Sequence, residues 1–161
     1  MKMSDLKRSF EAAGCKDVKT YLQSGNVIFA APEGEPAALK RRIQVKLFEL
    51  LGSEATVLFR TLREVEDIVR AAPLKDVEAD VDVKLYVAFL SRKPRRTPKL
   101  PVVSRTEALE AFQMRNLKVF IVNRKKNGRY GFPNNFIEKE FGVPATTRNW
   151  STVSKIVGLS S

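Results

Sequence analysis

PNNFIEKEFGVPATTRNWSTVSKIVGL, residues 133–159, is the stretch on which the expected fold depends most. Phe136 and Phe141 lie on one side of a predicted helix, and Gly142 is the usual type of residue for its C-terminal cap. From Trp150 onward, apolar residues recur at spacings of three and four, which predicts a second amphipathic helix. The chain should therefore end in two short helices.

The segment between these helices, residues 146–149, is expected to be a polar corner, with a last strand around Ala145 as a further element. Arg148 can hold a carboxylate or phosphate in a bidentate fork, with Trp150 as a stacking surface. In the structural interpretation, Asn149 is a helix N-cap, Trp150 is core and Arg148 pairs with a buried carboxylate. Both interpretations stay open at this stage.

The rest of the chain predicts two similar halves. Residues 4–60 predict helix, strand, strand, helix and strand, and residues 83–148 predict strand, helix, strand, strand and helix. Both approximate the βαββαβ unit of ferredoxin-like folds. The expected class is α+β, with two associated ferredoxin-like halves (residues 1–75 and 76–161), mainly antiparallel sheets and a C-terminal helical tail. The first half lacks its opening strand, which is central in that topology.

Several local signals define individual elements. Capping boxes at residues 61–64 and 104–107 predict the starts of two helices, the second running to about residue 112. Ser4 is expected to cap the first helix, and residues 55–60 predict a short strand. The sequence KKNG at 125–128 predicts a hairpin turn, because Asn and Gly tolerate left-handed conformations.

Composition excludes several classes of function. The 161 residues include no histidine, so imidazole ligands and Ser-His or Cys-His couples are excluded. The single cysteine, Cys15, excludes an internal disulfide and fits a reducing cytosol. No run approaches the roughly 18 apolar residues of a membrane helix. We expect a cytoplasmic protein without a cofactor or a membrane partner. We also expect a binder in preference to an enzyme, since no nucleophile-base couple is evident.

Nearly all of the net charge of +11 lies in residues 91–129, which carry 12 Lys and Arg against 2 Asp and Glu. A basic region of this kind favours encounter with polyanions such as RNA or single-stranded DNA. The predicted phosphate contacts are Arg92, Arg95, Arg96, Arg124, Lys125, Lys126 and Arg129. The sheet aromatics that can stack on bases are Tyr86, Phe89, Phe120 and Tyr130, unless strand alternation points some of them into the core. The competing interpretation is a solvated basic face.

The alternative function is an enzyme or receptor for a small anionic ligand held between the halves. Its candidate residues are Gln23, Ser24, Asn26, Asn134, Thr147, Arg148 and Trp150. The structural interpretation of residues 23–26 is a hairpin turn, and that of Asn134 and Asn135 is a helix cap. The alternating acids, Asp76, Glu78, Asp80 and Asp82, favour a solvated loop over a cation site, so no metal is expected.

Three stretches carry a resemblance to a known family: TYLQSGNVIF (20–29), NNFIEK (134–139) and PATTRNWSTV (144–153). Together they resemble the bacterial family of domain of unknown function 1697. The resemblance implies a pair of associated ferredoxin-like halves and no established activity. Members usually begin with a strand and an Arg-Gly-Ile-Asn-Val-Gly-Gly loop that this chain lacks. We therefore expect the natural start to lie upstream of Met1 or the chain to be shortened, with homodimerisation or strand donation as a possible consequence.

Overall fold

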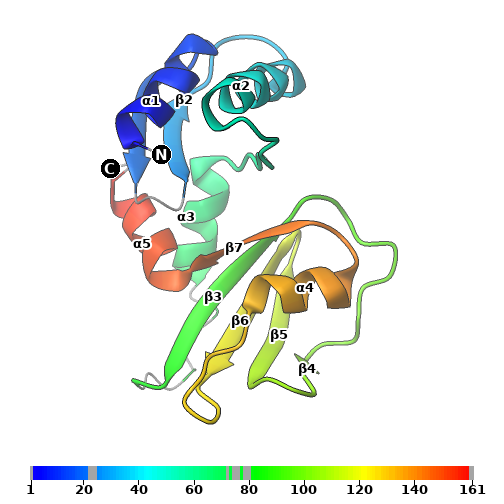
Figure 1. The fold of residues 1–161 in the computed structure, drawn as a ribbon. Coiled ribbons are helices and arrows are strands. Elements are labelled where there is room, and N and C mark those ends of the chain that lie inside the picture. The colour runs from blue at the N-terminus through cyan, green and yellow to red at the C-terminus, as the bar shows by residue number, and fades with distance from the viewer. Residues whose placement is uncertain (1, 22–24, 72, 74–76, 78–80, 160–161) are drawn as a thin grey trace. The chain divides into compact units, whose positions relative to one another are not determined.

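A computed structural model describes residues 2–21, 25–71, 73, 77 and 81–159, and the chain divides into two compact units (Figure 1). The first unit is Met1–Phe59 and the second is Arg60–Ser161. The sequence placed the division between residues 75 and 76. The contacts place helix α3 (Leu62–Ala71) in the second unit, because it packs against helix α5 (Trp150–Leu159).

The first unit consists of two helices and a two-stranded antiparallel sheet. Helices α1 (Met3–Ala12) and α2 (Pro36–Leu51) flank strands β1 (Lys16–Tyr21) and β2 (Asn26–Ala30) in the sequence. The predicted helix, hairpin and second helix are confirmed. Their shared core consists of Leu6, Phe10, Ala13, Cys15, Val18, Leu39, Ile43, Leu47 and Val57.

Two local predictions in this unit are wrong. Ser4 does not cap α1, because the helix begins one residue earlier, with Lys2 in the N-cap position and no side-chain cap. Residues 55–60 form no strand. Val57 packs into the core, and Phe59 meets Phe29 edge to face at 5.8 Å.

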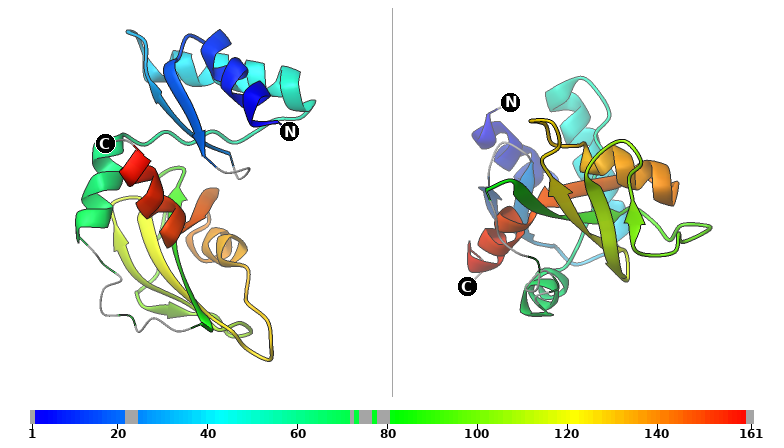
Figure 2. Two further views of the ribbon diagram at one scale, coloured as in Figure 1. Left: turned by 90° about the vertical axis from the view of Figure 1, so that its left-hand side faces the viewer. Right: turned by 90° about the horizontal axis from the view of Figure 1, so that it is seen from below.

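The second unit is built on a five-stranded antiparallel sheet in the order β4-β5-β6-β3-β7. Its elements are α3, β3 (Val83–Leu90), β4 (Val102–Val103), β5 (Leu109–Arg115), β6 (Lys118–Arg124), α4 (Pro133–Phe141), β7 (Ala145–Asn149) and α5. Helix α4 lies on one side of the sheet, and α3 and α5 lie on the other (Figure 2). The α+β class with mainly antiparallel sheets and a C-terminal helix is confirmed.

Two segments that the sequence assigned otherwise are strands. The box at 104–107 forms a local turn, in which Ser104 Oγ accepts a hydrogen bond from the Glu107 N–H at 3.1 Å, and β5 follows it instead of a helix. Pairing with β6 buries Leu109 and Ala111 on alternate positions and so overrides the helical signal. Residues 146–149 are likewise not a corner, because they pair with β3 as part of strand β7, and the last strand expected around Ala145 is confirmed.

The two faces of this sheet carry different side chains. Ala88, Leu90 and Ile121 face α4, where they share a core with Ile137. Neighbouring positions on the strands point to the opposite face, where fully buried Phe120 meets Trp150 of α5 edge to face at 6.3 Å. Both faces are therefore occupied by helices at the centre of the sheet.

Candidate nucleic-acid interface

A proline-rich arm, residues 91–101, leaves the sheet at the end of β3. Its base is fixed by backbone hydrogen bonds: the Leu90 N–H donates to the Leu117 oxygen at 2.8 Å, and the Ser91 N–H donates to the Pro144 oxygen at 2.9 Å. Arg60 adds a third contact, donating from Nη2 to the Leu90 oxygen at 2.7 Å. The arm therefore departs from a defined point on the sheet.

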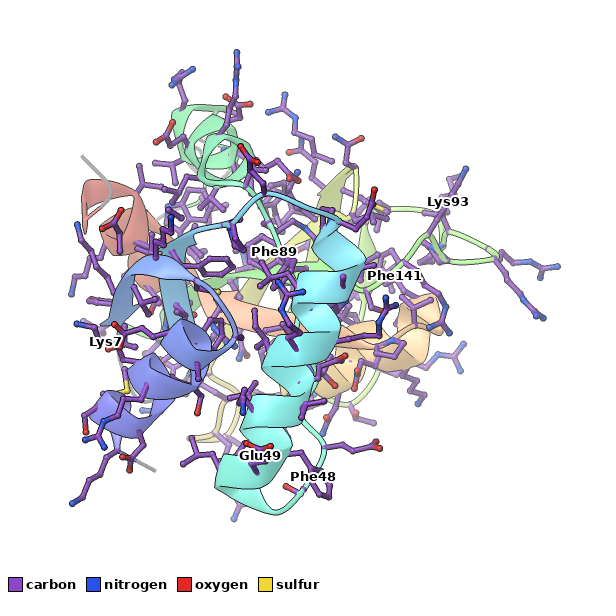
Figure 3. All side chains as sticks on the ribbon, turned by 90° about the horizontal axis from the view of Figure 1, so that it is seen from above. Lys7, Phe48, Glu49, Phe89, Lys93 and Phe141 are labelled. Atoms are coloured by element: carbon purple, nitrogen blue, oxygen red, sulfur yellow. The ribbon has the colours of Figure 1, made fainter. Side chains whose placement is uncertain are left out.

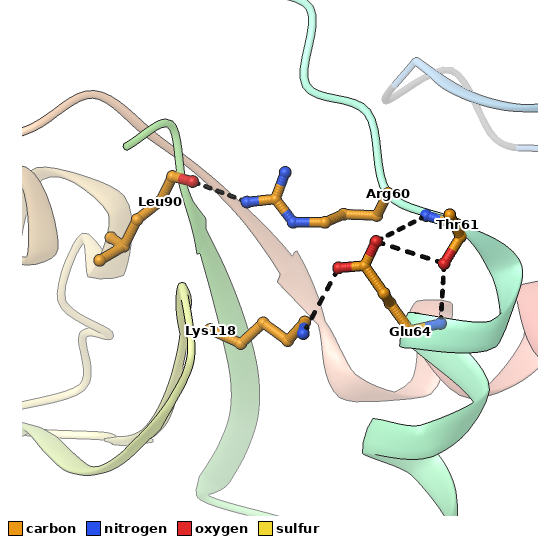
Figure 4. A network of polar contacts seen from close by, with 5 residues as sticks. All are labelled: Arg60, Thr61, Glu64, Leu90 and Lys118. Atoms are coloured by element: carbon orange, nitrogen blue, oxygen red, sulfur yellow. Dashed lines mark hydrogen bonds and ion pairs between the residues drawn. The ribbon is translucent and has the colours of Figure 1, made fainter. Parts of the chain in front are cut away.

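The cluster that holds this point combines a capping box with an ion pair (Figure 4). Thr61 N–H donates to Glu64 Oε1 at 3.1 Å, and the Glu64 N–H donates to Thr61 Oγ1 at 3.1 Å, as the sequence predicted. Glu64 Oε2 also lies 3.6 Å from the ammonium of buried Lys118. Burial alone would raise the pKa of Glu64, but the Thr61 N–H, Lys118 and Arg60 outweigh it and lower that pKa. Burial lowers the pKa of Arg60.

The arm and the C-terminal end of α4 line an open cavity of about 550 Å³, which we call the arm pocket. Its lining residues are Arg92, Lys93, Arg95, Arg96, Pro98, Lys139, Glu140, Phe141, Gly142 and Val143. Lys93 projects outward from the arm (Figure 3), whereas Phe141 of α4 is buried. Five cationic side chains and one carboxylate give the pocket a local charge of +4.

The cations of the arm pocket are available for an external anion. Arg92, Arg95 and Arg96 are exposed, and no described carboxylate lies within 4.0 Å of their guanidinium groups. The C-terminus of α4 contributes a partial negative charge of about half a unit, which the surrounding cations exceed. The pocket therefore attracts anions, and several arginines can bind phosphate oxygens in bidentate fashion.

The second group of predicted phosphate contacts lies elsewhere on the sheet. Residues Asn127 and Gly128 have positive φ values of 52° and 77°, so the predicted turn at 125–128 is confirmed. Arg124 pairs with Val83 at the opposite end of β3 from the arm. The 8 residues of β3 separate the two groups by about 25 Å, at a rise of roughly 3.3 Å per residue.

Two cations of the turn already have carboxylate partners. Arg124 Nη1 lies 3.6 Å from Glu110 Oε2, and Lys125 Nζ lies 4.0 Å from Asp82 Oδ1. Lys126 and Arg129 are exposed, and the structure gives neither of them a carboxylate among the described residues. The turn therefore offers fewer free cations than the arm pocket.

The aromatic residues expected to stack on bases are unsuited to that role. Phe89 is 8% exposed and Phe120 is 0% exposed, because both point into the core beneath α3 and α5, so their prediction is wrong. Tyr86 is half-buried, and burial raises its pKa. Tyr130 donates its hydroxyl hydrogen to the Val81 oxygen and is covered by the Lys84 ammonium at 4.3 Å from the ring centroid. The sequence could not separate these positions, because both faces of the sheet are apolar.

The small-ligand candidates do not converge on one face of the second unit. Thr147 and Asn134 lie on the α4 face, where the Thr147 hydroxyl donates to Asn134 Oδ1 at 2.7 Å. Arg148 occupies the next strand position and therefore the opposite face, where burial lowers its pKa. Its Nη1 donates to the Thr147 oxygen at 3.1 Å. Trp150 shares this second face through its contact with Phe120.

The other members of that set are placed as follows. Asn26 belongs to the first unit, where its Nδ2 donates to the Tyr21 oxygen at 3.1 Å. Gln23 and Ser24 lie outside the described residues. The predicted caps at Asn134 and Asn135 are wrong, because α4 begins at Pro133 with Phe132 in the N-cap position. The acids Asp76, Glu78 and Asp80 also lie outside the described residues.

Comparison with known families identifies the class of the chain. Residues 1–120 match the family model described as "Protein of unknown function (DUF1697)". The chain belongs to the DUF1697 family, and the matched part includes the whole arm. Comparisons with curated proteins and with solved structures gave no match. Among the described residues, no helix has the length and apolar character needed to cross a membrane.

Proposed function

We propose that the protein binds single-stranded nucleic acid without catalysing a reaction, and that the arm pocket holds the phosphate backbone. The observation that supports this function is the arm pocket itself: five cations surround one cavity, and the arginines among them have no described carboxylate partner. A phosphodiester backbone brings several charges to such a cavity and releases its condensed counterions on binding.

The charged lining of the arm pocket agrees with a polymeric anion more than with a small buried ligand. Its lining includes Phe141 and Val143, which are both buried, whereas Arg92, Arg95 and Arg96 are exposed. Pockets for small molecules are mostly apolar and bury most of the ligand surface. A nucleic-acid backbone that crosses the pocket and continues beyond it can bind through the cations at its rim alone.

A titration with fluorescently labelled single-stranded RNA and DNA tests the proposal by anisotropy. The arm variant carries Arg92→Glu, Arg95→Glu and Arg96→Glu, and the matched control carries Arg124→Glu, Lys125→Glu and Lys126→Glu at the turn. Both variants change the net charge equally, so a difference between them reports a local site and not overall charge. All six positions are exposed, and Trp150 fluorescence checks that each variant is folded.

We expect the arm variant to lose most of its affinity and the turn variant to retain much more. Equal losses in both variants would contradict a site at the arm pocket and would indicate attraction by net charge alone. An unmodified protein that binds neither RNA nor DNA at low salt would contradict the proposed function.

A further inference from the structure

Phe132 is an exposed aromatic side chain at the N-terminal end of α4, three residues after Arg129. It is 68% exposed, which is unusual for a Phe in this chain, since most of the described ones are buried or half-buried. It follows Arg129 and the turn in sequence, and it directly precedes Pro133, the first residue of α4. An exposed ring beside cations is the combination by which proteins bind single-stranded nucleic acid, because bases stack on the ring.

The backbone that carries this ring is rigidly held. The Phe132 N–H donates to Glu107 Oε2 at 2.8 Å. The preceding residue, Gly131, exchanges two hydrogen bonds with the fully buried side chain of Asn123, at 3.0 and 3.2 Å. A Cβ on Gly131 would lie 2.6 Å from Glu107 Oε2, so the segment packs closely against that side chain. Because the backbone at Phe132 is already held by these contacts, little backbone freedom is lost when a base stacks on the ring.

Phe132 and the arm pocket lie at the two ends of α4. Phe132 is the N-cap residue of the helix, and Lys139 and Gly142 at its other end line the pocket. The 9 residues of α4 span about 14 Å at a rise of roughly 1.5 Å per residue. A stacked strand advances about 3.4 Å per nucleotide, so roughly four nucleotides cover this distance.

We propose that Phe132 stacks on a base of a single-stranded nucleic acid whose phosphates are held in the arm pocket, with the strand running along α4. This inference rests on the proposed function and adds the element that distinguishes a nucleic acid from other polyanions. Cations bind any phosphate chain, whereas a stacking ring requires a base.

The experiment compares two probes on the full chain: a labelled single-stranded RNA of about ten nucleotides and inorganic polyphosphate, which has no bases. The variants are Phe132→Ala, Phe132→Trp and the control Phe48→Ala, which removes another exposed Phe on α2 of the first unit. Stacking of one base typically contributes about 1–3 kcal/mol, which corresponds to roughly a 5- to 150-fold change in affinity.

We expect Phe132→Ala to weaken RNA binding at least about fivefold while leaving polyphosphate binding unchanged. Phe132→Trp should retain RNA binding, and its added tryptophan emission should be quenched when the RNA binds. Oligonucleotides shorter than about four nucleotides should lose the dependence on Phe132, because they cannot span α4.

The two proposals fail in different ways. RNA binding that is equally strong in Phe132→Ala would overturn the stacking role and leave the proposed function intact. Equal weakening of RNA and polyphosphate would also overturn it, because the ring would then act only through the fold. Absence of binding by the unmodified protein would contradict the proposed function and this inference together.

Discussion

The ion pair between Glu64 and Lys118 should stabilise the second unit, and its contribution can be isolated by substitution. Lys118 lies on β6 with a side chain 7% exposed, and its ammonium is 3.6 Å from Glu64 Oε2. The change Glu64→Gln removes the charge but keeps an amide that can still complete the capping box with Thr61. The substitution therefore leaves a buried ammonium without its carboxylate, and it also removes the attraction between Glu64 and Arg60.

The expected magnitude follows from the burial of the two partners. Breaking a fully buried pair costs about 3–5 kcal/mol, and an exposed pair contributes at most about 1 kcal/mol. The Glu64 side chain is 43% exposed, so water screens the interaction from one side. We expect Glu64→Gln to lower the free energy of unfolding by about 1–2 kcal/mol. Lys118→Met should be neutral or stabilising, because an apolar chain of similar size replaces the buried charge.

Urea unfolding followed by tryptophan fluorescence measures this effect in the second unit, because Trp150 is the only tryptophan and contacts Phe120 on the same face as Lys118. The two single variants and the double variant form a cycle. We expect Glu64→Gln to cost about 1 kcal/mol less in the Lys118→Met background than in the unmodified protein. The same cost in both backgrounds would refute the reasoning, because the effect would then not come from the pair.

Three further predictions concern pH, packing and the cysteine. Folding lowers the pKa of Glu64. The ionised carboxylate therefore stabilises the fold at pH values above the ordinary glutamate pKa of about 4.3, and this stabilisation is lost as the pH falls through the lowered pKa. Urea midpoints should therefore fall more steeply on acidification in the unmodified protein than in Glu64→Gln, and parallel curves would count against the shift. Gly131→Ala should lower the free energy of unfolding by about 1–3 kcal/mol, because the added Cβ would clash with Glu107. Gly158→Ala on α5 should not destabilise, because its added Cβ would meet no described atom within 4 Å. An unfolding curve for Gly131→Ala that matches the unmodified protein would show that the segment can shift. Burial raises the pKa of Cys15 despite the opposing effect of Arg42, so a thiol reagent should label it only as urea unfolds the first unit. Rapid labelling in native buffer would contradict its burial.

The elements that could be predicted from the sequence are those whose own periodicity is uninterrupted. Leu39, Ile43 and Leu47 recur at helical spacing and form the buried side of α2, and the apolar run at 83–90 forms β3. Strand β5 could not be predicted in this way, because pairing with β6 decided its conformation against a capping signal at Ser104. Strand β7 was expected around Ala145, but residues 146–149 were assigned to a corner, because they are polar and have no strand-like alternation of apolar residues.

The candidate site was predictable in part. The charge run identified Arg92, Arg95 and Arg96, because composition alone reveals a basic segment. The sequence could not show that Lys139 joins them, since only the packing of the arm near the end of α4 brings it to the pocket. Phe132 was missed because a single aromatic residue before a proline has no periodic signal.

The salt dependence of RNA binding tests the arm pocket most directly. For single strands, the logarithm of the affinity falls by about 0.7 per unit of log salt for each phosphate contact. If most of the five cations of the pocket contact phosphates, the slope should be roughly −2 to −3.5 in the unmodified protein. The slope should become shallower by about 2 when Arg92, Arg95 and Arg96 are reversed. An unchanged slope in that variant would contradict the claim that the arm pocket holds the phosphate backbone.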